Sequence, residues 1–314
     1  MKQLKLNKYL TVAIVLMTLS ISACEDVVEV ELPESETAIV IDAWINNLPQ
    51  RQMIRITETL PYFQNDYQPG VNGAIVTVTD NQQNEYEFLP DDDPGVYSWV
   101  PSSEAENFGE IGRSYQLRIE LEDQVFESNS TMSRVPAVDS ITFRFEEGNG
   151  FFPDSYFGSV YATDFQGIGD TYWIKAWKNG EFLNKPGEIN LAFDAGFTQG
   201  GSVDGITFIQ PVRDGINAFD QDENDDFLSP YEPGDSVYIE IHSISLQAFD
   251  FLNQVIIQSD RPGGFGQLFA QPLSNVPSNI KRISGSAEQE VIGFFNVSAV
   301  SAAGKILDPD DLPE

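Results

Sequence analysis

The chain is poor in the side chains that most often build covalent and metal-dependent chemistry. Its 314 residues include one cysteine, Cys24, and one histidine, His242. A single cysteine cannot form an intrachain disulfide, and one histidine without free thiols does not make a zinc site. A Ser-His-Asp triad would have to use His242, but we expect that residue on the wetter face of a strand, because Val237, Ile239 and Ile241 carry the apolar face. The sequence contains no Gly-x-Ser-x-Gly motif, and we expect that the chain is not an enzyme.

Basic residues are also scarce. The 17 lysines and arginines are outnumbered by 49 aspartates and glutamates, for a net charge of −32. Such a surface repels nucleic acid, so we expect no nucleic-acid partner. It suits cationic ligands or divalent ions, although solubility alone is the simplest interpretation. The composition is 41% hydrophobic and 12% aromatic, which is enough for a folded core.

Long hydrophobic runs are missing except near the N-terminus. Three lysines within residues 1–8 precede the apolar run Leu10–Ile21, which small residues and then Cys24 follow. The run is shorter than the roughly 20 residues that a transmembrane helix needs. The order of basic, apolar and small residues predicts a secretory signal peptide over residues 1–23, and its ending resembles the bacterial lipobox. We therefore predict that the thiol of Cys24 carries the lipid, including palmitate, that anchors the mature protein to a membrane.

Residues 24–36 form an acidic segment that we interpret as a tether between lipid and folded domain. Glu25 and Asp26 directly follow the cysteine, as acidic residues do in several groups of surface-exported lipoproteins. This predicts an outer-membrane protein that faces the cell surface. In another lineage, an aspartate at this position signals retention in the inner membrane, so the periplasmic alternative stays open.

From residue 37 onward the pattern is one of short strands and turns. Residues 37–135 contain about seven segments of alternating or apolar character, such as Ser114–Leu121, bounded by Gly, Pro, Asn and Asp. This pattern predicts an antiparallel β-sandwich of immunoglobulin-like type. After Val135-Pro136 we expect a second β-rich domain over residues 136–314, with one amphipathic helix at about 245–258 that Ser245 caps. Further strands are expected at 205–211 and, as the last one, at 291–300.

One loop has the spacing of a calcium site. Asp220, Asp222, Asn224 and Asp226 alternate along an acidic run, and hard oxygen ligands on a short loop suit Ca²⁺. The sixth position of such a loop is Asp225 instead of glycine, and the twelfth is not glutamate. The alternative is a solvated acidic loop. No other cofactor is expected.

Several segments, spread over nearly the whole mature chain, resemble the secreted lipoprotein family catalogued as domain of unknown function 4249. The segments that carry the resemblance are Cys24–Pro33, Ala38–Ile45, Leu60–Phe63, Gly73–Asp80, Gly95–Tyr97, Gly112–Leu117, Val138–Ile141, Gly234–Val237, Ala248–Leu252 and Gly293–Phe295. The resemblance implies an outer-membrane lipoprotein, often encoded beside a TonB-dependent transporter. The first domain also looks like a transthyretin-like module. The resemblance supplies no catalytic residues.

These observations together lead to one functional expectation and two alternatives. The expectation is a lipid-anchored binding protein that assists a TonB-dependent transporter in nutrient uptake, with a small ligand that the sequence does not identify. The first alternative is a structural or adhesion lipoprotein. The second is a carbohydrate-active enzyme, because 49 carboxylates always offer pairs that a glycosidase could use.

Overall fold

The computed structural model describes residues 37–61, 66–103, 106–150, 152–201, 203–216, 220–221, 226–261, 270, 272, 274–285 and 290–312. Residues Glu36–Glu314 form one compact unit. Among the described residues, no helix combines the length and the apolar character needed to cross a membrane.

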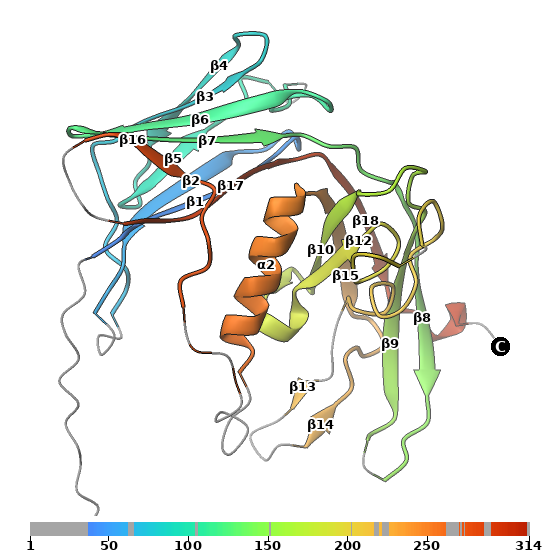
Figure 1. The fold of residues 1–314 in the computed structure, drawn as a ribbon. Coiled ribbons are helices and arrows are strands. Elements are labelled where there is room, and N and C mark those ends of the chain that lie inside the picture. Colours follow the sequence, from blue (N-terminus) through green and yellow to red (C-terminus); the bar gives the residue numbers. More distant parts are fainter. Residues whose placement is uncertain are drawn as a thin grey trace, which may run out of the picture. The chain divides into compact units, whose positions relative to one another are not determined.

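The first part of the fold is a nine-stranded sheet in the order β16-β7-β6-β3-β4-β5-β2-β1-β17. Its strands are β1 (Ile39–Asn46), β2 (Gln52–Glu58), β3 (Ile75–Asp80), β4 (Glu85–Pro90), β5 (Val96–Trp99), β6 (Ser114–Leu121), β7 (Gln124–Thr131), β16 (Lys281–Ser284) and β17 (Val291–Ser298). The sheet folds over at β4, whose first residues pair with β3 and whose last two pair with β5. The two halves form the layers of a β-sandwich (Figure 1).

The core of this sandwich follows from the alternation of side chains along its strands. On β6, Tyr115, Leu117, Ile119 and Leu121 are all buried in the same hydrophobic cluster. On β1, the isoleucines at positions 39, 41 and 45 enter this core, while Asp42 and Trp44 point to the opposite face. The outer face of β1 is therefore free to contact the second part of the fold.

The second part combines a five-stranded sheet, a two-stranded hairpin and a helix. The sheet contains β10 (Thr171–Lys178), β11 (Glu181–Leu183), β12 (Asn190–Phe193), β15 (Ser236–Ser243) and β18 (Val300–Ile306). The hairpin is β8 (Val138–Glu146) with β9 (Ser155–Ala162), and it packs on one face of the sheet through a hydrophobic cluster. The remaining elements are the short hairpin of β13 (Asp220–Gln221) and β14 (Phe227–Leu228), the helix α2 (Leu246–Ser259), and the 3₁₀ turns η1 (Pro186–Glu188) and η3 (Pro309–Asp311).

The helix α2 packs on the face of the second sheet opposite the β8–β9 hairpin, near β10 and β17 (Figure 1). Its buried residues Ala248, Phe249 and Leu252 join a third hydrophobic cluster. That cluster also contains Phe294 of β17, and Trp44 of β1 packs against it. The third cluster thus connects the sandwich with the second sheet.

The chain passes from one sheet to the other between β17 and β18, with only Ala299 between them. β17 runs parallel to β1, whereas the other pairs of the nine-stranded sheet are antiparallel. The close approach of β17 to β1 requires glycine at position 293, since a Cβ there would lie 2.0 Å from the carbonyl oxygen of Ile41. Gly293 also has φ of +107°, which disfavours any other residue.

The predicted fold class is confirmed: the protein is mostly β, with a sandwich first and, within the described part of the later region, one α-helix. The helix occupies Leu246–Ser259, close to the predicted 245–258, and Ser245 caps it. The expected single strand at 291–300 is instead two strands in two sheets, so the nine-stranded sheet includes residues from far beyond position 136. The strand expected at 205–211 was wrong, since these residues form turns with one bridge from Thr207 to Thr163. β11, β13, β14, β16 and β18 were not anticipated.

Candidate functional site

A groove of about 530 Å³ lies between the helix α2 and the edge of the sandwich. Four residues of α2 line it: Gln247, Asp250, Phe251 and Gln254. They recur at intervals of three and four positions, so they form one stripe along the helix. The helix therefore buries one face in the third hydrophobic cluster and presents a mostly polar stripe to the groove.

The local sequence fixes where this stripe points. The Ser245 hydroxyl accepts a hydrogen bond from the backbone N–H of Ala248 at 3.1 Å, which caps the first turn. The backbone N–H of Ser245 donates to Oδ1 of Asn296 on β17, also at 3.1 Å. The start of α2 is therefore held to β17, and Phe249 and Leu252 set its rotation by packing inward.

The opposite wall comes from the last two strands at one end of the nine-stranded sheet, β7 and the edge strand β16. β7 contributes Glu127, Ser128 and Asn129, and β16 contributes Lys281 and Ile283. Lys281 is directly across from Glu127 in the register of the two strands. This wall of the groove therefore carries one acidic and one basic side chain, opposite each other on neighbouring strands.

The segment before β16 completes this wall. The side chain of Asn279 binds the backbone of Phe295 twice, accepting from its N–H at 2.9 Å and donating to its carbonyl at 2.8 Å. The Ser128 hydroxyl donates to the carbonyl of Asn279 at 3.0 Å. These bonds hold residues 277–279 in place across the sandwich edge.

Two phenylalanine rings supply the apolar part of the lining. Phe251 and Phe294 lie with ring centroids 4.7 Å apart, and Trp44 stacks on Phe294 at 5.6 Å. The ring of Trp173 meets that of Trp44 edge-on at 5.2 Å. Two of the four tryptophans are therefore part of the packing behind the groove.

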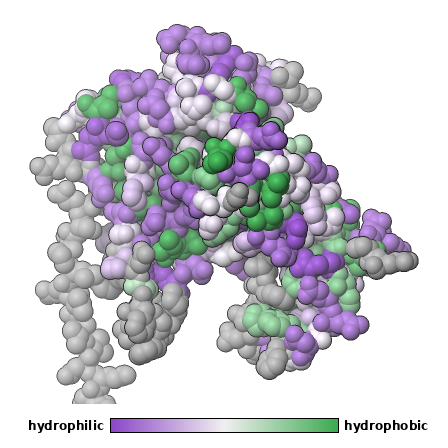
Figure 2. Space-filling view, turned by 45° about the vertical axis from the view of Figure 1, so that its right-hand side comes forward, coloured by the Kyte–Doolittle hydropathy of each residue, from purple (hydrophilic) through white to green (hydrophobic). Residues whose placement is uncertain are grey.

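The lining suits a neutral ligand that carries hydroxyl groups. The amides of Gln247, Gln254 and Asn129 can both donate and accept, and the carboxylate of Asp250 accepts. Aromatic rings beside such groups offer apolar contact for the carbon skeleton. Anionic ligands are disfavoured by the chain's net charge of −32 and by the acidic lining residues. The face drawn in Figure 2 is mostly hydrophilic, with small separate hydrophobic patches.

His242 differs from its expected place. It does lie on the face of β15 opposite Val237, Ile239 and Ile241, as the alternation requires, but it is only 4% exposed. The imidazole lies 6.4 Å from the ring of Trp173, centroid to centroid, and Nε2 is hydrogen-bonded to Glu240 at 2.7 Å. The predicted wetter face was wrong because tertiary packing covers it.

The other predicted site residues fall mainly outside the described residues. Cys24, Glu25 and Asp26 do, as do Asp222 and Asn224 of the proposed calcium loop. The backbone of Asp220 belongs to β13, which pairs with β14, and Asp226 is exposed just before β14. The calcium prediction at this loop stays a prediction. Among the described residues, the group of carboxylates close enough to share an ion is another one, Asp164, Asp194 and Asp204.

The groove residues were missed by the sequence analysis. The polar positions 247, 250 and 254 are visible as the face of the helix opposite Phe249 and Leu252. Polar faces of amphipathic helices usually meet only water, and nothing local indicates that a sandwich edge lies across from this one.

Comparisons with known proteins give a family but no activity. A family model described as "Domain of unknown function (DUF4249)" matches residues 25–303. No curated protein matches the chain. Among solved structures, a segment of two fibronectin type III domains from chicken tenascin is similar at 11% sequence identity. The match covers 67% of this chain and 92% of the tenascin segment, with a TM-score of 0.20.

Proposed function

The chain belongs to the DUF4249 family, and we propose that it is a lipid-anchored binding protein of the outer membrane that faces the cell surface. In this proposal it assists a TonB-dependent transporter in nutrient uptake, and the groove between α2 and the sandwich edge holds the nutrient. The observation that carries the proposal is that groove: its size is that of a small-molecule site and its lining combines amides, a carboxylate and aromatic rings.

The N-terminal sequence supports the anchored location. A lipid on Cys24 would restrict the protein to the membrane plane, which raises its effective concentration near a membrane partner. The acidic tether of residues 24–36 would extend the folded unit away from the lipid. A protein held this way is well placed to pass a ligand to a transporter.

The interior position of His242 also favours binding over hydrolysis by a histidine base. A general base must come within hydrogen-bond distance of the substrate proton it removes, directly or through one water. The only imidazole of the chain is 4% exposed and is bound to Glu240. The groove residues named above can form hydrogen bonds with a ligand that is bound and then released without a chemical reaction.

The transporter role is tested by purification in mild detergent through a C-terminal tag, from cells that express the neighbouring genes. A barrel transporter recovered with the lipoprotein is the expected result. Recovery of the lipoprotein alone would contradict the role and favour the structural or adhesion alternative. Protease added to intact cells should degrade the protein, whereas survival until the outer membrane is broken would place it in the periplasm.

The ligand role is tested by calorimetry against a panel of neutral oligosaccharides. Gln254→Trp should fill the groove and weaken binding at least tenfold, because Gln254 is exposed on its helical wall. The matched control is Gln82→Trp, the same substitution at an exposed turn of the sandwich. Equal binding by both variants would exclude the groove. Cleavage of an oligosaccharide during the titration would instead support the carbohydrate-active enzyme.

A further inference from the structure

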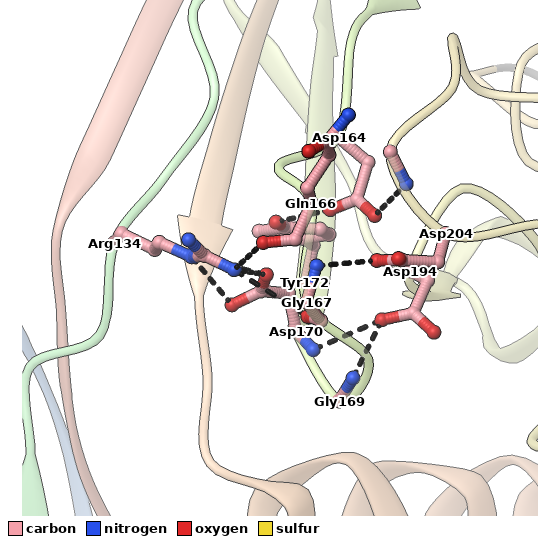
Figure 3. A network of polar contacts seen from close by, with 10 residues as sticks. Arg134, Asp164, Gln166, Gly167, Gly169, Asp170, Tyr172, Asp194 and Asp204 are labelled. Carbon is pink, nitrogen blue, oxygen red and sulfur yellow. Dashed lines mark hydrogen bonds and ion pairs between the residues drawn. The ribbon is translucent and has the colours of Figure 1, made fainter.

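Three aspartate side chains converge at one end of the second sheet (Figure 3). Asp164 follows β9, Asp194 follows β12, and Asp204 lies in the loop after it. Each offers a carboxylate oxygen, and these oxygens lie within 4.8 Å of one another. Oxygens that bind one Ca²⁺ at about 2.4 Å can be at most about 4.8 Å apart, so the cluster has the dimensions of a single coordination shell.

Backbone N–H groups orient all three carboxylates. Oδ1 of Asp194 accepts from Gly169 at 2.8 Å and from Asp170 at 3.0 Å. Oδ1 of Asp204 accepts from Gly167 at 2.9 Å. Asp194 and Asp204 are thus fixed by backbone groups of the β9–β10 loop, which is the preorganisation that an ion site requires.

The third carboxylate is held in the same way. Asp164 accepts a hydrogen bond from the hydroxyl of Tyr172 at 2.7 Å on Oδ1, and one from the N–H of Gly205 at 3.2 Å on Oδ2. Burial raises the pKa of Asp164 above its ordinary value, and repulsion from Asp170 and Asp194 adds to the rise. The fold thus brings negative charges together at a cost that a bound cation would remove.

One carboxylate oxygen of Asp194 has no hydrogen-bond partner among the described residues. Its side chain is only 1% exposed, and its Oδ2 is buried without a hydrogen bond. A buried carboxylate oxygen without a partner is costly, because it has lost its contact with water. An ion bound through both oxygens of Asp194 would satisfy Oδ2.

The nearby positive charge is already engaged. Arg134 forms an ion pair with Asp170 at 2.6 Å and also donates to the carbonyls of Gln166 and Gly167. One arginine therefore stands beside four carboxylates in this network (Figure 3). The excess of negative charge is on Asp164, Asp194 and Asp204.

We propose that Asp164, Asp194 and Asp204 bind one Ca²⁺ ion, which fastens the β9–β10 loop to the loop that follows β12. Carboxylate oxygens are the hard ligands that Ca²⁺ prefers, and ligands from two separate loops suit its tolerant geometry better than the strict octahedron of Mg²⁺. The site is distinct from the acidic run at 220–226. It does not depend on the proposed transport function.

The test uses the full chain in mild detergent with Tb³⁺ and Ca²⁺ as probes. Tb³⁺ takes the place of Ca²⁺ at oxygen sites, and Tyr172 beside Asp164 should sensitise its emission. We expect Tb³⁺ emission that millimolar Ca²⁺ displaces, and a melting temperature that rises with Ca²⁺ by mass action. No emission and no change of melting temperature at millimolar Ca²⁺ would overturn the proposal.

Two variants locate the ion. Asp204→Asn should weaken Ca²⁺ binding at least tenfold while keeping the fold, because the amide oxygen can still accept from Gly167. The matched control is Asp222→Asn in the acidic run, which should bind as the wild type does. Loss of binding in Asp222→Asn with retention in Asp204→Asn would overturn the proposal and assign the ion to the run at 220–226.

Discussion

His242 donates a hydrogen bond from Nε2 to Oε2 of Glu240 over 2.7 Å, within the protein interior. Burial lowers the pKa of His242 to about 4, and the charge of Lys175 adds to this effect. Burial by itself would raise the pKa of Glu240, but the hydrogen bond from His242 holds it below its ordinary value. The pair is thus a neutral imidazole bound to a carboxylate at neutral pH.

We predict that the free energy of unfolding falls as the pH drops from about 6.5 to about 4. Between these values the unfolded chain binds a proton at His242 that the folded chain does not, so protonation favours unfolding. Glu240 acts in the same direction, because a lowered carboxyl pKa gives stability that is lost as the pH falls through the folded value. The histidine shift corresponds to about 3 kcal/mol at most. Urea unfolding across this range should show the loss, and His242→Gln should flatten it.

The same histidine allows a direct check. Because the chain has one histidine, a single imidazole resonance reports it in NMR spectra of a protein without a histidine tag. We expect that resonance to stay unchanged from pH 8 down to about 5. A midpoint near 6.5 would contradict the buried, neutral imidazole.

Lys175 should be less favourable in the folded protein than an apolar residue of similar length. Burial lowers its pKa to about 8, although Glu240 and Asp42 oppose this, so the folded state disfavours the charged form. We predict that Lys175→Met stabilises the protein at pH 7 by about 1–2 kcal/mol. The gain should shrink as the pH rises from 8 to 10.5, because the wild-type lysine then becomes neutral in the fold before it does in the unfolded chain. Paired unfolding curves at pH 7 and 10 measure this.

One contact of Lys175 stabilises its charged form in the folded protein. The Lys175 Nζ lies 4.0 Å from the ring centroid of Trp173, a cation–π contact that methionine cannot make. If Lys175→Met destabilises the protein at pH 7, this contact outweighs the cost of burying the charge.

The N-cap of α2 should contribute about 1 kcal/mol to the free energy of unfolding, because the Ser245 hydroxyl accepts a hydrogen bond from the N–H of Ala248. We predict that Ser245→Ala lowers the free energy of unfolding by that amount. Ser245→Asp should restore most of it, because aspartate is an equally good cap and its charge suits a helix N-terminus. Urea denaturation of the wild type and the two variants measures these differences. If Ser245→Asp is no more stable than Ser245→Ala, the loss of stability does not come from the cap.

The anchor is tested at Cys24. We predict that Cys24→Ser abolishes lipidation and processing, because the thiol is the group that carries the lipid. Labelled palmitate followed through the wild type and the variant provides the measurement. Equal label in both proteins would contradict the lipoprotein prediction.

Local patterns were enough to predict most strands and the helix. Tyr115, Leu117, Ile119 and Leu121 alternate in sequence and are all buried in the sandwich core. Ser245 before an apolar periodic run located the helix correctly. These signals depend on neighbours within a few residues, which a sequence shows directly.

The remaining features depend on contacts between distant parts of the chain. Nothing near Gly293 indicates that β17 pairs with β1, which lies about 250 residues earlier. The alternation along β15 predicted which face His242 occupies, but not that this face is covered. The aspartates at 164, 194 and 204 lie near loop glycines, as residues of ordinary turns also do. Only the packing of the β9–β10 loop against the loop after β12 brings the three together.

Arg134 lies beside the proposed calcium site, and its guanidinium binds Asp170 and two carbonyls of the β9–β10 loop. Arg134→Gln should destabilise the calcium-free protein, because Asp170 loses its ion partner and the loop loses its bonds. The same variant should bind Ca²⁺ more tightly, by up to about fivefold at low salt, because a positive charge next to Asp164, Asp194 and Asp204 is gone. A merely structural role for Arg134 would lower stability and Ca²⁺ affinity together. A lower melting temperature without Ca²⁺ together with a higher Tb³⁺ affinity would therefore identify the arginine as a nearby positive charge that opposes ion binding by repulsion.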